Sequence, residues 1–195
     1  MIVFLDIETT WQSDLFGVFT DNIKANKTLK DPEKINADLA KKTLEAKEKM
    51  CVDKDFNEIK MIGILIDGEY KKMSLIEWLE WDKENSPFYI TYNGLDFDFP
   101  VIIRNIIKQG IECSPRSWGN LKSYLDKRGN SHEDLMKSLC GYGEWKSLDL
   151  LSQVYLGKKK EPIDFMTCTD KELASHNEED LRLLEALYDK FKFIM

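Results

Sequence analysis

Four short apolar runs, bounded by turn or charged residues, stand out in the first hundred positions. The β-branched and aromatic run over residues 2–7 predicts a buried strand that ends in charged residues. Further apolar runs predict strands over 59–66, 69–73 and 87–92, with Asp67-Gly68 as a hairpin turn. The first three of these strands are therefore expected to form a meander rather than a βαβ unit.

Between and after these strands, apolar positions recur at helical spacing. Ser74-Leu75-Ile76-Glu77 has the capping-box pattern and predicts a helix that ends near Glu84. Further helices are predicted over 101–109 and 148–156, each followed by glycine. A second capping box at Thr169–Glu172 opens a long helix whose core-facing residues are Leu181, Leu184, Leu187 and Phe191.

A polar segment rich in lysine and glutamate separates the first two strands, at about residues 11–58. Ile35, Leu39, Ala46 and Met50 recur there at helical spacing and predict one amphipathic helix over much of the segment. We find no hinge between two separate cores. The sequence therefore predicts a single α/β domain over 1–195 with a helical insertion at about 11–58.

Composition limits the functional classes. Hydrophobic residues make up 43% of the 195 residues, which is enough for a sizeable core. The four cysteines form no CxxC pair, which argues against a zinc cluster or disulfide framework. No apolar run approaches the roughly 20 residues of a membrane span. We therefore expect a soluble, cytoplasmic protein with no membrane partner.

A net charge of −7 argues against strong nonspecific binding to nucleic-acid phosphates, because such binding depends on lysine and arginine side chains. Basic groups such as Lys158-Lys159-Lys160 are more often solvated faces than binding sites. An acidic balance still permits a nucleic-acid enzyme. Divalent cations held by carboxylates supply positive charge where the phosphate binds.

The chain's candidate chemistry lies in its acidic residues. Asp6 and Glu8 are two apart on the first predicted strand, so both side chains point to the same face. Two such carboxylates repel each other unless a cation lies between them, and hard oxygen ligands suit Mg²⁺ or Mn²⁺. The alternative for an isolated acid-x-acid pair is a solvent-facing strand end.

Two further acidic segments accompany this pair. Asn93 begins a turn that leads to Asp96 and Asp98, and Asp98 is the acid that begins the following helix. Near the C-terminus, His176 precedes Asp180 by four residues, which places both on one helical face.

Together these residues resemble the DnaQ-like, or DEDD, 3′-to-5′ exonuclease superfamily, which includes the editing domains of family B DNA polymerases. The insertion, including Lys30–Ile35, resembles that of predicted phage and bacterial exonucleases related to these domains. The superfamily has a tyrosine four residues, or a histidine five residues, before its last aspartate, so this chain is of mixed subclass. Its three motifs match, in order, Asp6-Ile7-Glu8-Thr9-Thr10, then Asn93 with Phe97-Asp98, then His176 with Asp180.

The resemblance implies a ribonuclease-H-like mixed sheet, with a three-strand antiparallel meander plus parallel strands, flanked by helices. It implies two Mg²⁺ or Mn²⁺ ions and a general base, His176, whose pKa the neighbouring carboxylates are expected to raise. Thr9, Thr10 and Asn93 would contact the terminal nucleotide. The metal ligands would be Asp6, Glu8, Asp98 and Asp180.

The expected reaction is phosphodiester hydrolysis at a free 3′ end, most simply of a single strand, releasing nucleoside 5′-monophosphates. The chain would edit or repair DNA, or degrade RNA, alone or beside a separate polymerase or replication protein of a phage or bacterium. Two alternatives stay open. One is a catalytically silent relative that binds nucleic acid, and the other is a ribonuclease-H-like endonuclease.

Overall fold

The computed structural model describes residues 1–126, 130–141, 143–165 and 167–193. The chain divides into two compact units. Unit 1 comprises Met1–Glu8 and Ile59–Met195, and unit 2 comprises Thr9–Glu58. The prediction of a single exonuclease domain with an insertion stays a prediction.

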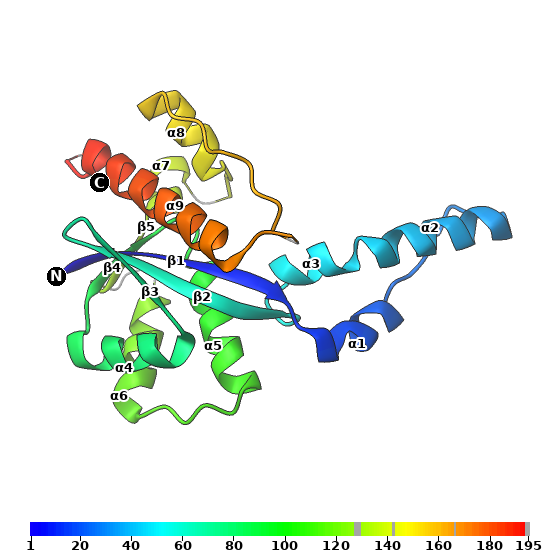
Figure 1. Cartoon of the computed structure of the whole chain (residues 1–195), viewed down its shortest axis with the longest axis horizontal. Coiled ribbons are helices and arrows are strands. Elements are labelled where there is room, and N and C mark those ends of the chain that lie inside the picture. Colours follow the sequence, from blue (N-terminus) through cyan, green and yellow to red (C-terminus); the bar gives the residue numbers. More distant parts are fainter. Residues whose placement is uncertain (127–129, 142, 166, 194–195) are drawn as a thin grey trace. The chain divides into compact units, whose positions relative to one another are not determined.

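A five-stranded mixed sheet forms the centre of unit 1, with strand order β3-β2-β1-β4-β5 (Figure 1). β2 and β3 are antiparallel, whereas β1 pairs with β4, and β4 with β5, in parallel. Asp67 and Gly68 both have positive φ at the β2–β3 turn, as a tight hairpin requires. The strands are β1 (Ile2–Trp11), β2 (Asn57–Ile66), β3 (Glu69–Met73), β4 (Phe88–Thr91) and β5 (His132–Asp134).

Helices cover both faces of this sheet, which makes unit 1 a three-layer α/β structure (Figure 1). One face carries α4 (Leu75–Asn85), α5 (Asp98–Lys108) and α6 (Pro115–Tyr124), and the other carries α7 (Leu135–Cys140), α8 (Leu148–Leu156) and α9 (Asp170–Phe191). The predicted capping boxes at Ser74 and Thr169 are both present. The predicted fold class, a ribonuclease-H-like mixed sheet flanked by helices, is confirmed.

The alternation of side chains along β1 determines which layer each residue meets. Val3, Leu5 and Ile7 are buried in the core beneath α4, α5 and α6. Phe4 is buried in the opposite core, against α9. Because successive strand residues point to opposite faces, Asp6 and Glu8 share the side of Phe4 and therefore face α9.

Unit 2 is helical, but not as the sequence predicts. Instead of one long amphipathic helix it contains α2 and α3, which meet at Glu45. The helical spacing is shared by both, yet α2 has no buried residue while α3 buries Ala46 and Met50. The prediction of one helix was wrong because spacing alone does not reveal a break. The elements are η1 (Ser13–Leu15), α1 (Phe16–Asp21), α2 (Pro32–Leu44) and α3 (Ala46–Val52).

The described part of the chain contains no helix that is both long and apolar enough to cross a membrane.

Candidate active site

The parallel pairing of β1 with β4 brings two of the acidic segments to one edge of the sheet. Ile2, Val3 and Phe4 pair with Phe88, Tyr89 and Ile90, so both strands end at the same edge. Ligand sites of open α/β sheets lie outside such carboxyl ends of strands. Asp6 and Glu8 of β1 and the turn that follows β4 therefore meet there.

Asp98 reaches β1 from the first turn of α5. Its Oδ1 accepts a hydrogen bond of 3.2 Å from the backbone N–H of Ile7, between Asp6 and Glu8. The Asp98 side chain is 2% exposed, whereas Asp96 is 55% exposed and forms an ion pair with Lys137. Of the two candidate acids in this segment, Asp98 is the one beside the β1 carboxylates.

The turn that delivers Asp98 is held by a residue that the sequence did not single out. Asp134, at the end of β5, accepts hydrogen bonds of 3.0 Å from the backbone N–H groups of both Asn93 and Leu95. Asn93 is in the left-handed region, with a φ of 69°. The structure therefore shows Asn93 shaping the turn through its backbone.

A hydrogen-bonded chain supports the same turn from the β5 side. His132 Nδ1 is 2.7 Å from the carbonyl of Tyr124, which can only accept, so Nδ1 carries the proton and donates. His132 Nε2 then accepts from the Thr91 hydroxyl at 2.7 Å. The Thr91 oxygen in turn accepts from the N–H of Gly94 at 3.1 Å. Burial lowers the pKa of His132, which favours this neutral form.

Helix α9 contributes the fourth carboxylate. Asp180 is 14% exposed and lies on the face of α9 that is directed toward Asp6 and Glu8. From there its charge raises the pKa of both carboxyl groups. His176 lies one turn earlier, with its Nε2 3.9 Å from Asp180 Oδ2. The structure therefore brings together Asp6, Glu8, Asp98, Asp180 and His176, all within unit 1.

Thr9 and Thr10 follow Glu8 on β1 and belong to unit 2. The Thr9 hydroxyl donates a hydrogen bond of 2.7 Å to the backbone carbonyl of Cys51, within that unit. Their predicted contacts with the terminal nucleotide stay a prediction.

Lys160 is a second site residue that the sequence did not single out. Its ammonium lies 2.5 Å from Asp180 Oδ1 and donates a hydrogen bond of 2.6 Å to Oδ2. Its backbone N–H donates to Asp149 Oδ1 at 2.9 Å, which anchors the segment after α8. The interpretation of Lys158–Lys160 as a solvated face was therefore wrong for Lys160, which is 18% exposed and paired.

The carboxylates strongly perturb one another. Burial raises the pKa of Asp6, and the charges of Glu8 and Asp180 raise it further. Burial, with the charge of Asp180, raises the pKa of Glu8 to about 8. Burial and the charge of Asp6 likewise raise the pKa of Asp98. This cluster is therefore costly to ionise fully without a counter-charge.

His176 departs from its expected ionisation. Burial lowers its pKa, and this outweighs the attraction of Asp180, which acts in the opposite direction. The ammonium of Lys160 adds to the lowering. The neighbouring carboxylates do act to raise the pKa of His176, as predicted, but the expected net rise was wrong, because the side chain is only 10% exposed and Lys160 was not foreseen nearby.

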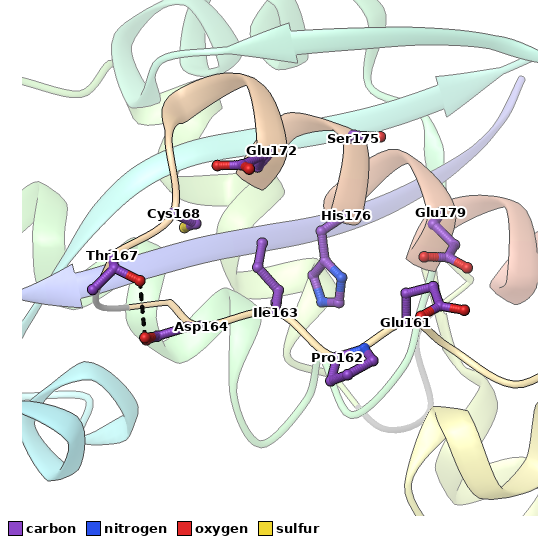
Figure 2. Close-up of a pocket in the computed structure, with 10 residues that line it drawn as sticks. All are labelled: Glu161, Pro162, Ile163, Asp164, Thr167, Cys168, Glu172, Ser175, His176 and Glu179. Carbon is purple, nitrogen blue, oxygen red and sulfur yellow. Dashed lines mark hydrogen bonds between the residues drawn. The ribbon is translucent and has the colours of Figure 1, made fainter.

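A pocket of 440 Å³ opens beside His176, between α9 and the segment that follows α8. Figure 2 shows the imidazole projecting from α9 toward Pro162 and Ile163. The ring edge also packs on Phe165, with centroids 5.4 Å apart. The pocket's acidic lining disfavours a phosphate there. The lining residues are Glu161, Pro162, Ile163, Asp164, Thr167, Cys168, Glu172, Ser175, His176 and Glu179.

The donor set of the cluster suits a hard divalent cation, because its ligands are carboxylate oxygens. Asp180 Oδ1 is buried and lies 2.5 Å from the Lys160 ammonium, so this oxygen already has a cation as its partner. Within the described ranges, no group of three or more His, Cys, Asp or Glu side chains is already arranged as a metal site.

The raised pKa of Glu8 predicts how the metal-free protein responds to pH. The folded state binds the Glu8 proton more tightly than the unfolded state does. Protonated Glu8 therefore adds to the free energy of unfolding below about pH 4.5, and this contribution is lost as pH rises toward about 8. Glu8→Gln has no proton to lose, so its free energy of unfolding does not decrease in this way. Urea unfolding in EDTA should show the variant gaining of the order of 3 kcal/mol over the parent between pH 5 and pH 8. Parallel pH profiles for the two proteins would contradict the assignment.

Comparisons with known proteins bear on the fold. No protein-family model and no curated protein sequence matches the chain. Among solved structures, it is similar to the family B DNA polymerase of the hyperthermophilic archaeon Pyrobaculum calidifontis, with a TM-score of 0.57 and 13% sequence identity. The match covers 97% of this chain and 24% of the polymerase chain. At this identity the likeness shows a shared fold, that of a quarter of the polymerase.

Proposed function

We propose that this protein is a divalent-metal-dependent 3′-to-5′ exonuclease that releases nucleoside 5′-monophosphates. The observation that carries the proposal is the meeting of Asp6, Glu8, Asp98 and Asp180 at one edge of the sheet. Their order along the chain is that of the exonuclease motifs they resemble. The fold shared with a family B DNA polymerase is in keeping with this function.

The proposed cofactors are two Mg²⁺ or Mn²⁺ ions. Asp6, Glu8 and Asp180 would hold one ion, and Asp6 the other, with Asp98 reaching it directly or through water. When bound, such ions stabilise charge on the phosphate oxygens and activate water. The pKa values of Asp6, Glu8 and Asp98, raised by burial and further by their mutual repulsion, support this proposal, since a bound cation stabilises the charged form of each carboxylate.

The residues of the chain have separate tasks in this scheme. His176, whose pKa burial lowers, is neutral at pH 7 and can accept the proton of the attacking water. The ammonium of Lys160 balances the charge of Asp180 in the metal-free protein. Asp134 and His132 hold the turn that presents Asp98. The substrate in this proposal is a single strand with a free 3′ end.

The first test is mononucleotide release from 5′-labelled single-stranded DNA and RNA with Mg²⁺ or Mn²⁺. We expect a ladder that shortens from the 3′ end and disappears with EDTA. A strand with a blocked 3′ terminus and a closed circle are the matched controls, and both should stay intact. Cutting of the circle would indicate an endonuclease instead, and binding without cleavage would indicate a silent relative.

A further inference from the structure

Asn177, the residue after His176 on α9, is fully buried although its side chain is polar. Its amide Nδ2 donates a hydrogen bond of 2.8 Å to Asp6 Oδ2. Its Oδ1 accepts a hydrogen bond of 3.2 Å from the Tyr70 hydroxyl. One side chain thus links α9 to β1 and to β3.

The sheet leaves space for this amide at a glycine. A Cβ built on Gly63 of β2 would lie 1.6 Å from Asn177 Oδ1, far inside van der Waals contact. No other residue fits at position 63 unless the amide moves. The absent side chain of Gly63 and the Tyr70 hydroxyl therefore form a slot that fits the Asn177 amide.

The Asp6 carboxylate determines which way the amide points. A carboxylate oxygen only accepts, so Asn177 Oδ1 is left to accept from the Tyr70 hydroxyl, and the end of the amide that faces Asp6 is its NH₂ group. That group is a neutral donor, so it holds one oxygen of Asp6 and leaves the other oxygen able to bind a cation.

We propose that Asn177 is a positioning residue that orients the Asp6 carboxylate for the metal ions, with Tyr70 and Gly63 fixing its amide. This inference rests on the proposed function. Ligating carboxylates are commonly oriented by such hydrogen bonds, and loss of the partner weakens metal affinity about 10- to 100-fold.

The test is Mn²⁺ binding to the full chain by isothermal titration calorimetry without nucleic acid, with the thermal midpoint measured in parallel. Asn177→Ala should weaken the Mn²⁺ Kd about 10- to 100-fold. Tyr70→Phe, which removes one hydroxyl, should weaken it less. The double variant should bind no more weakly than Asn177→Ala, because Tyr70 acts through Asn177. Unchanged Mn²⁺ affinity in both single variants, with or without a lower thermal midpoint, would reduce Asn177 to a packing residue.

Asp6→Asn separates this inference from the function on which it rests. If Asp6→Asn weakens Mn²⁺ binding and the Asn177 and Tyr70 variants do not, only the positioning role fails. If the parent binds no Mn²⁺, or Asp6→Asn binds it equally well, the proposed metal site itself is wrong. Should Asn177→Ala not fold, Tyr70→Phe decides the question, since it leaves the Asn177 side chain in place.

Discussion

Asp6→Asn is expected to lower nucleotide release by about a thousand-fold or more, a loss of several kcal/mol of transition-state stabilisation. Asp6 interacts with each of the other carboxylates of the cluster and with Asn177. It raises the pKa of Asp98, its own pKa is raised by Glu8 and Asp180, and Asn177 donates to it. The neutral amide of the variant cannot replace a carboxylate that both ions would share.

The same substitution should not destabilise the metal-free fold. An asparagine at position 6 keeps an oxygen that can accept from Asn177, and it removes one charge from a repelling cluster. Thermal unfolding in EDTA should therefore show an equal or higher midpoint. Asp96→Asn is the matched control, because Asp96 is exposed and paired with Lys137, and it should retain activity. Full activity of Asp6→Asn would remove the carboxylate cluster from the mechanism.

His176→Ala is expected to lower turnover by about 10²- to 10⁴-fold, the usual contribution of a general base. The imidazole is beside Asp180 and borders the pocket shown in Figure 2. Since burial lowers its pKa, the ring is neutral near pH 7 and can accept a proton. The measurement is single-turnover cleavage at saturating Mg²⁺, which reports the chemical step.

If His176 acts as a base and not as a metal ligand, its substitution should lower turnover without weakening metal binding. Mn²⁺ affinity of His176→Ala, measured by calorimetry, should stay within a few-fold of the parent. Ser175→Ala is the matched control, because it changes the preceding residue of the same helix and pocket without removing a base. Equal turnover in His176→Ala and Ser175→Ala would exclude His176 as the base.

Local signals in the sequence were sufficient for most of unit 1. The hairpin at Asp67-Gly68 and the helix over 148–156 occur as predicted, because turn residues and a glycine stop act within a few positions. The short strand β5 and the helices α6 and α7 were not predicted. β5 has only three residues, His132–Asp134, and its strand conformation depends on pairing with β4.

The site divides in the same way. Asp6 with Glu8, and His176 with Asp180, were predicted from short spacings that reflect strand and helix periodicity. Asp98 was predicted from its place at a helix start and from the resemblance to the exonuclease motifs. Asp134, Lys160 and Asn177 were not found, because each acts on a residue far away in the sequence. Asn177 bonds to Asp6 across 171 positions, and Lys160 pairs with Asp180 across 20.

The sequence by itself determined the first four strands, the main helices and the carboxylates that the proposed chemistry requires, since each is encoded within a few neighbouring residues. Only the tertiary structure showed that Asp98 accepts a hydrogen bond from the backbone of β1, and that Lys160 pairs with Asp180. It also decided that the pKa of His176 is lowered. Burial and charge act through space, so groups remote along the chain determine them.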